Sequence, residues 1–233
     1  MTSPTTPYPI GTPGQPWTAA ERATWLDMQR LRRSYRDEVR EPLAALSPRF
    51  SITQYGALPH NPERYPLLAV MGADPSPDRP WALVTGGVHG YETSGVQGAL
   101  SFLAGPAERY LDRVNLLVAP CVSPWGYETI NRWNPRAIDP NRSFVADSPA
   151  EEAALLMARV ARVAGVKGAA GRQWLLHIDL HETTDSDEGE FRPALAARDG
   201  KPFEPGLIPD GFYTVADAAN PQPAFQAASI AAV

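Results

Sequence analysis

The sequence has only one cysteine, Cys121, in 233 residues. It can therefore form neither an internal disulfide nor a zinc site built from several thiolates. Cys121 ends an apolar run at residues 116–121, so we expect it to be a small buried side chain. Concentrated positive charge is missing too, because 21 Lys and Arg residues stand against 26 Asp and Glu residues, a net charge of −5. This balance argues against a protein that binds nucleic acid or an anionic membrane.

Long apolar stretches are also absent. No segment approaches the roughly 20 apolar residues that a membrane-spanning helix needs. The N-terminus is rich in Pro, Thr and Gly and lacks the basic start and apolar core of a secretory signal. We therefore expect an extended arm at residues 1–16, then one globular domain at residues 17–233, in the cytoplasm.

Alternating and continuous apolar patterns predict the secondary structure. A helix is expected from Thr18 until Pro42 ends it, another after the glycine-rich turn at residues 86–90, and a third from Ser148 through Val163. Residues 182–211, which include an acidic patch at residues 185–190, are expected as a long loop, and residues 212–215 as a short strand. The five main strands are predicted at residues 51–55, 67–71, 81–85, 114–119 and 174–180.

The order of these elements predicts an α/β fold. We expect a mixed, largely parallel central sheet with helices on both faces. One more helical pattern begins at Pro223 and stops at the last residue, Val233. A C-terminally truncated domain is therefore an alternative to a complete one.

Histidines are few, and two of the four stand at special places. His89 and His181 each follow directly on a predicted strand, and Glu92 comes three residues after His89. The carboxyl ends of such strands meet at one edge of an α/β sheet, where ligands bind. Two imidazoles and one carboxylate form a common ligand set for catalytic zinc, which leaves a fourth position for water. Nitrogen ligands also favour Zn²⁺ over Mg²⁺ or Ca²⁺, so these three residues predict a zinc site.

Two histidines stay outside this set. His177 lies within a predicted strand, on the same face as Asp179 and His181, because side chains alternate along a strand. It either supports the metal site or is a core residue with a satisfied ring. His60 lies in a proline-rich loop, and we expect it on the surface.

A long polar stretch at residues 120–145 follows a predicted central strand and can reach the same edge. It carries Arg132, Asn141 and Arg142. Arginine presents a planar fork of donors to carboxylates, so two arginines and an amide suit an anionic group of a substrate. A solvated loop with a capping asparagine is the alternative.

Three segments together carry a family resemblance. They are GGVHGYET at residues 86–93, NRWNPRAIDPNRSF at residues 131–144 and HIDLHE at residues 177–182. In this order they resemble the motifs of the zinc carboxypeptidase family, the carboxypeptidase A and B group, including its succinylglutamate desuccinylase and aspartoacylase branch. Each motif alone is common, whereas the ordered set is specific.

The resemblance implies a role for each residue. His89, Glu92 and His181 would bind zinc. Arg132 would polarise the scissile carbonyl and stabilise its oxyanion. The substrate's terminal carboxylate would be bound by a neighbouring pair, Asn141 and Arg142.

The implied function is zinc-dependent hydrolysis of an amide bond next to a free carboxylate, in a peptide or an N-acyl amino acid. A metallocarboxypeptidase is the first hypothesis and an N-acyl amino acid deacylase the second. In the family, the general base is a glutamate on a strand well downstream of the third zinc ligand. Here Glu182 is the nearest candidate, and side-chain alternation would turn it away from His181. A zinc-binding protein with little or no catalysis is therefore the third hypothesis.

Overall fold

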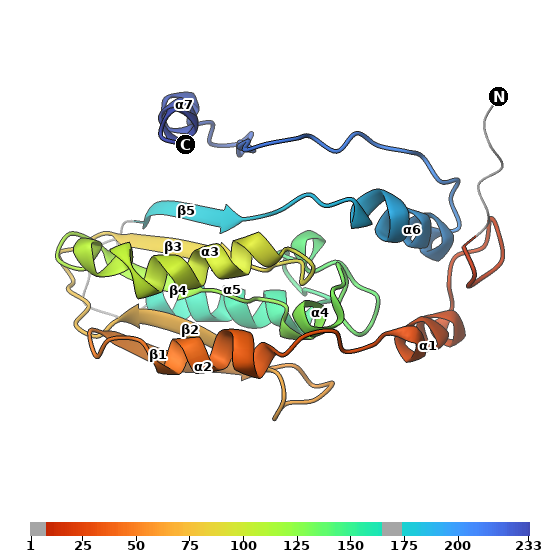
Figure 1. Cartoon of the computed structure of the whole chain (residues 1–233), viewed down its shortest axis with the longest axis horizontal. Helices are drawn as coiled ribbons and strands as arrows, with labels where there is room; N and C mark the ends of the chain where they lie inside the picture. The colour runs from red at the N-terminus through yellow and green to blue at the C-terminus, as the bar shows by residue number, and fades with distance from the viewer. Residues whose placement is uncertain (1–7, 165–173) are drawn as a thin grey trace.

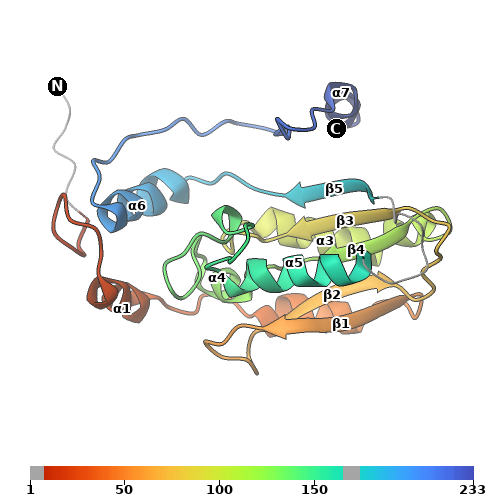
Figure 2. The ribbon, with the colours of Figure 1, turned by 180° about the vertical axis from the view of Figure 1, so that it is seen from behind.

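The computed structural model describes residues 8–164 and 174–233, which build one five-stranded sheet with helices packed around it (Figures 1 and 2). Strand β3 pairs in parallel with β4 and with β5, whereas β2 is antiparallel to both β1 and β4. The predicted α/β class with a mixed sheet is thus confirmed. In sheet order the strands are β1 (Phe50–Ala57), β2 (Pro66–Gly72), β4 (Asn115–Ala119), β3 (Trp81–Gly86) and β5 (Trp174–Leu180).

Helices cover both faces of the sheet, with α2 and α3 on one face and α5 on the other (Figures 1 and 2). Alternate residues of the central strand β4 explain this arrangement, since Leu116 packs in the α3 layer with Val96, and Leu117 packs with Val163 of α5. A strand buried on both faces needs a continuous apolar run, as found here. The α-helices are α1 (Ala19–Met28), α2 (Glu41–Ala44), α3 (Thr93–Ala104), α4 (Pro124–Thr129), α5 (Glu151–Ala164), α6 (Arg192–Asp199) and α7 (Pro223–Ala231). Shorter 3₁₀ and π turns are η1 (Arg36–Arg40), η2 (Pro106–Tyr110), η3 (Pro140–Arg142) and η4 (Asp187–Phe191).

The N-terminal helix differs from the prediction. Helix α1 starts with the expected capping box between Thr18 and Glu21, but it ends at Met28. The next residues cross to helix α4, where the backbone N–H of Arg32 donates to the Glu128 carbonyl at 2.7 Å. These long-range hydrogen bonds replace the helical ones, so the apolar periodicity of the sequence was overridden by tertiary contacts.

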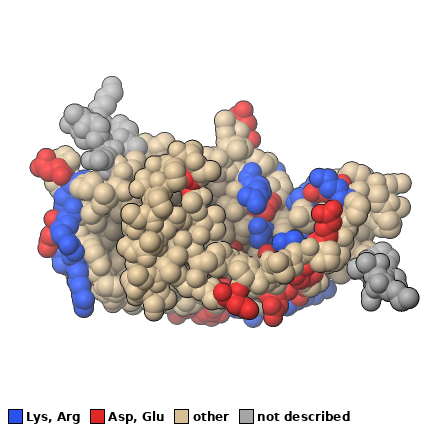
Figure 3. All heavy atoms as spheres, turned by 90° about the horizontal axis from the view of Figure 1, so that it is seen from above, with Lys and Arg blue, Asp and Glu red and all other residues tan. Residues whose placement is uncertain are grey.

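The C-terminal part contains two further differences. Residues 201–222 form neither helix nor strand, so the expected strand at residues 212–215 is wrong. The acidic patch at residues 185–190, expected as a loop, instead leads through η4 into α6. The C-terminal segment, residues 201–233, includes α7. In the view from above, few charged side chains lie around α7 (Figure 3). Exposed apolar residues of the segment include Leu207, Val215, Phe225 and Ile230.

Two smaller points concern the N-terminal arm and membranes. Residues 1–7 of the expected arm lie outside the described residues, and Ile10, in its remaining part, is buried. Within the described ranges, no helix is both long enough and apolar enough to cross a membrane.

Candidate metal centre

The turn after β3 brings His89 and Glu92 into the interior. Gly87 adopts a positive φ of 58°, which favours glycine, and Gly90 lies so close to α4 that a Cβ would be 1.8 Å from the Gly126 carbonyl carbon. This compact turn folds both side chains inward, and both residues have 0% exposed surface. His89 Nδ1 lies 2.7 Å from Glu92 Oε1.

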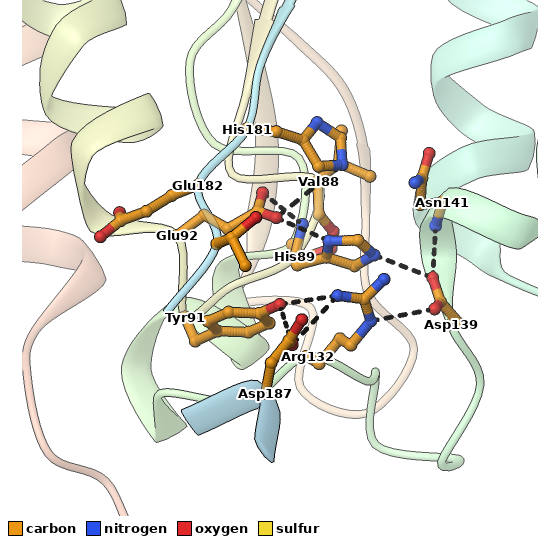
Figure 4. Close-up of polar contacts among 12 residues, drawn as sticks. Val88, His89, Tyr91, Glu92, Arg132, Asp139, Asn141, His181, Glu182 and Asp187 are labelled. Atoms are coloured by element: carbon orange, nitrogen blue, oxygen red, sulfur yellow. Dashed lines mark hydrogen bonds and ion pairs between the residues drawn. The ribbon is translucent and has the colours of Figure 1, made fainter. Parts of the chain in front are cut away.

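Strand β5 delivers the third residue to the same edge. It runs parallel to β3, and the last residues of the two strands, Gly86 and Leu180, lie opposite each other. His181 directly follows Leu180, so it lies beside the turn that follows β3. Its Nε2 is 3.8 Å from Glu92 Oε1, and its ring is perpendicular to that of His89 at 5.0 Å between centroids. One ligand atom from each of the three residues lies within 4.8 Å of the others (Figure 4).

This spacing can be compared with the geometry of a metal site. Tetrahedral zinc with bonds of about 2.0–2.1 Å places its ligand atoms about 3.4 Å apart. The buried His89 and Glu92 are already close, and Nε2 of the partly exposed His181 lies 3.8 Å from Glu92 Oε1, near this spacing. The three residues therefore fit a metal ion that accepts nitrogen and oxygen ligands.

Each histidine also has a carboxylate on its other ring nitrogen. His89 Nε2 is 3.0 Å from Asp139 Oδ1, and His181 Nδ1 is 2.8 Å from Asp179 Oδ2. Carboxylates in this position fix the tautomer and orientation of metal-binding imidazoles. Burial opposes ionisation of Asp139, but hydrogen bonds and charge from His89 and Arg132 keep its pKa below the usual range. Asp139 therefore remains a carboxylate that can accept a hydrogen bond from a ring N–H of His89.

His177, within strand β5, lies apart from the three candidate metal ligands. It is exposed on this strand, and its Nε2 lies 3.1 Å from Thr85 Oγ1. Thr85 in turn donates to Asp179 at 2.7 Å. His177 is therefore not a buried core residue, and among the described residues its hydrogen bond to Thr85 connects it to the site.

Arg132 lies beside His89, held from several sides (Figure 4). Its Nε donates to Asp139 Oδ2 at 3.2 Å, and one terminal nitrogen donates to the Tyr91 hydroxyl at 2.6 Å and to Asp187 at 3.3 Å. Its guanidinium also lies 4.4 Å from the centre of the Phe191 ring. The other terminal nitrogen makes no hydrogen bond to the described residues, which leaves its two N–H donors for a ligand.

The other two residues of the polar stretch are placed differently. The backbone N–H of Asn141 donates to Asp139 Oδ1 at 2.9 Å, so Asn141 adjoins the site through its main chain. Arg142 ends the short turn η3 and is exposed, without an ion pair to any part of the chain that the structure describes. Within this stretch, hydrogen bonds hold the side chains of Arg132 and Asp139, whereas the side chain of Arg142 is exposed to solvent.

The side chain of Glu182 does not face the candidate metal ligands, which are His89, Glu92 and His181. Its Oε2 accepts hydrogen bonds from the backbone N–H and the hydroxyl of Ser94, both at 2.8 Å. This places its carboxylate at the start of α3, away from His181 (Figure 4).

The sequence interpretation missed the contacts made by Tyr91 and Asp187. The Tyr91 hydroxyl donates to Asp187 at 2.6 Å while accepting from Arg132. Tyr91 lies between His89 and Glu92 in the sequence, so this position could have indicated that it belongs to the site. Asp187 belongs to an acidic patch that gave no indication of which carboxylate reaches Arg132.

Solved structures of other proteins share the α/β fold of this chain. No family profile and no curated protein matches the sequence. A candidate metallopeptidase from Shewanella denitrificans superposes with a TM-score of 0.51 at 26% sequence identity. The chain shares its α/β fold with this Shewanella protein. The match covers 64% of this chain and 52% of the Shewanella protein, so the chain spans about half of that protein's length.

Two more distant structures are similar in outline. A metallo-carboxypeptidase from Burkholderia cenocepacia is 19% identical, with a TM-score of 0.48 over 72% of this chain and 42% of its own. An aspartoacylase family protein from Mesorhizobium loti is 17% identical, with a TM-score of 0.42 over 58% of this chain and 41% of its own.

Proposed function

We propose that the chain carries the metal-binding part of a zinc-dependent hydrolase that cleaves an amide bond next to a free carboxylate, as a metallocarboxypeptidase does. The observation that carries the proposal is the convergence of His89, Glu92 and His181 within 4.8 Å, with a carboxylate behind each imidazole. The similarity to a candidate metallopeptidase of 26% identity supports it.

The ligand set suits zinc, which when bound supplies Lewis acidity toward the substrate carbonyl and lowers the pKa of water to about 7. With zinc bound, Asp139 would hold the proton of His89 on Nε2 and leave Nδ1, which lies 2.7 Å from Glu92 Oε1, as the nitrogen that binds the metal.

Arg132 is proposed to stabilise the oxyanion that forms as the amide is attacked. Asp139, Tyr91 and Asp187 fix its guanidinium before a substrate arrives, so little reorganisation is needed. A preorganised donor of this kind typically lowers an activation barrier by about 3 kcal/mol.

Arg142 and Asn141 are proposed to bind the free carboxylate of the substrate. The exposed guanidinium of Arg142 offers paired donors that match a carboxylate. Asn141 is adjacent in the same turn, η3, and η3 adjoins Asp139. This arrangement favours a substrate with a terminal carboxylate over an internal peptide bond.

The proton transfer to the leaving amine is not assigned to a residue. Glu182 is held at α3 by Ser94, and Asp139 and Asp187 are paired with Arg132. These contacts support the third hypothesis, a protein that binds zinc with little turnover of its own, as an alternative to the hydrolase.

The deciding experiment combines metal binding with three substrates. The chain is loaded with Zn²⁺ and given peptides with a free C-terminus, the same peptides amidated, and N-acyl amino acids. We expect release of C-terminal residues from the free peptides only, loss of activity with a chelator, and recovery with Zn²⁺. His181→Ala should abolish zinc binding, and His60→Ala, at an exposed loop histidine, serves as the matched control.

Each other outcome points elsewhere. Turnover of N-acyl amino acids alone would identify a deacylase. Zinc binding without turnover would identify the non-catalytic protein, and no zinc binding by the unaltered chain would end the proposal.

A further inference from the structure

Glu152 is a buried carboxyl away from the metal centre. It is the second residue of α5, with 0% exposed surface. Its Oε2 accepts a hydrogen bond from Asn134 Nδ2 at 3.3 Å. Its Oε1 is buried without a hydrogen bond to the described residues.

A carboxyl at this position is costly. Burial raises the pKa of Glu152 to about 7, because the charged form is removed from water. An apolar side chain of similar size would occupy such a site at a lower cost. Among the described residues, the side-chain hydrogen bond that Glu152 makes is the one from Asn134, which points to Asn134 as the group that it serves.

Asn134 organises the turn that follows it. Its Oδ1 accepts from the backbone N–H groups of Arg136 at 3.0 Å and Ile138 at 3.2 Å, and its own backbone N–H donates to the Ile138 carbonyl at 2.9 Å. Within the turn, Ala137 has a φ of 55°, in the left-handed region that non-glycine residues avoid. A turn with such a residue persists only when its surroundings hold it.

The turn joins two residues of the metal centre. Arg132 precedes Asn134 by two positions, and Asp139 follows Ile138 directly. Arg132 and Asp139 bond to each other at 3.2 Å, and Asp139 bonds to His89 at 3.0 Å. We propose that Glu152, acting through Asn134, is a positioning residue that sets Asp139 and Arg132 against His89.

The turn also has an outer attachment that provides a control. Arg136 pairs with Glu151 at 3.0 Å and donates to the Pro149 carbonyl, next to the start of α5. The Glu151 side chain is 32% exposed, and the side chain of Arg136 is 54% exposed. Exposed ion pairs contribute little to stability, so Glu151 should matter far less than its buried neighbour Glu152.

The test reads the ring of His89 directly, in the full chain without zinc. The protein has four histidines, so ¹⁵N-labelled histidine gives a simple spectrum of ring N–H groups. Asp139→Asn identifies the signal of the His89 Nε2 proton. We expect Glu152→Gln, whose amide oxygen can still accept from Asn134, to leave this signal in place. Glu152→Leu should shift or broaden it, although the variant folds, as circular dichroism would verify.

A second measurement uses Zn²⁺ affinity. Loss of a residue that orients a metal ligand typically weakens metal binding about 10- to 100-fold, and we expect this for Glu152→Leu but not for Glu152→Gln or Glu151→Gln. An unchanged His89 signal in Glu152→Leu would overturn the inference. The purpose of this positioning, to prepare His89 for zinc, rests on the proposed function. The His89 signal, however, is measured without metal. Failure of the unaltered chain to bind zinc would therefore reject the proposed function but not the positioning by Glu152.

Discussion

The imidazole of His89 is held between two carboxylates, with Asp139 Oδ1 3.0 Å from its Nε2 and Glu92 Oε1 2.7 Å from its Nδ1. Asp139 also accepts from Arg132, so one carboxylate fixes both a proposed metal ligand and the proposed oxyanion donor. This shared carboxylate links the turn after β3, which carries His89 and Glu92, to the polar stretch after β4.

Asp139→Asn should weaken zinc binding by about 10- to 100-fold, the usual effect of removing the carboxylate behind a metal-binding histidine. The substitution keeps the size of the side chain but removes the charge that holds the Nε2 proton. Competition with a chromogenic chelator measures the affinity. Asp112→Asn, at a side chain that is 84% exposed, is the matched control. Equal affinities in both variants would show that Asp139 does not orient His89.

Arg132→Lys should lower kcat/KM for a C-terminal substrate by roughly 100- to 1,000-fold, because a donor aimed at the oxyanion is lost. Lysine keeps the positive charge but cannot bond Asp139 and Tyr91 while presenting a further donor. Zinc affinity should change less than kcat/KM. Arg109→Lys, at an exposed position, is the control. A small loss for Arg132→Lys, similar to that of the control, would mean that only charge matters at this position.

Glu182→Gln should leave zinc affinity and kcat within about twofold of the unaltered chain, because its carboxylate bonds Ser94 and not the candidate metal ligands. Losing the charged acceptor at the start of α3 should instead lower the free energy of unfolding by about 1 kcal/mol. Urea denaturation measures this loss. In a Ser94→Ala background the loss should be smaller but still present, because the hydroxyl donor is gone while the backbone N–H of residue 94 still donates to residue 182. A drop in kcat of a hundredfold or more would identify Glu182 as the general base after all.

Local patterns explain which features could be predicted from the sequence. Strands β3 and β4 are continuous apolar runs because both of their faces are covered, and His89 and Glu92 share a single turn. His181 follows directly on another predicted strand, so it too could be predicted from the sequence. By contrast, the path of Arg32 depends on a hydrogen bond to Glu128, and the partner of Arg132 in the acidic patch depends on how η4 packs. Such contacts join residues far apart in sequence, which no local pattern records.

Glu152 predicts a pH dependence of stability. Burial raises its folded-state pKa from 4.5 to about 7, so between these values the native state holds a proton that the unfolded state has released. The free energy of unfolding therefore falls as pH rises across this window, by about 3 kcal/mol for this one group. Below pH 4.5 the group contributes no such loss.

Glu152→Gln should remove this loss, because glutamine does not ionise and can still accept from Asn134. Relative to the unaltered chain, the variant should gain about 2 to 3 kcal/mol in unfolding free energy between pH 5 and pH 8. Urea denaturation at the two pH values measures the difference, with Glu151→Gln as the neighbouring control, for which we expect little change. A constant difference across this range would mean that Glu152 titrates as an ordinary exposed glutamate, and hence that its carboxyl is not sealed from water.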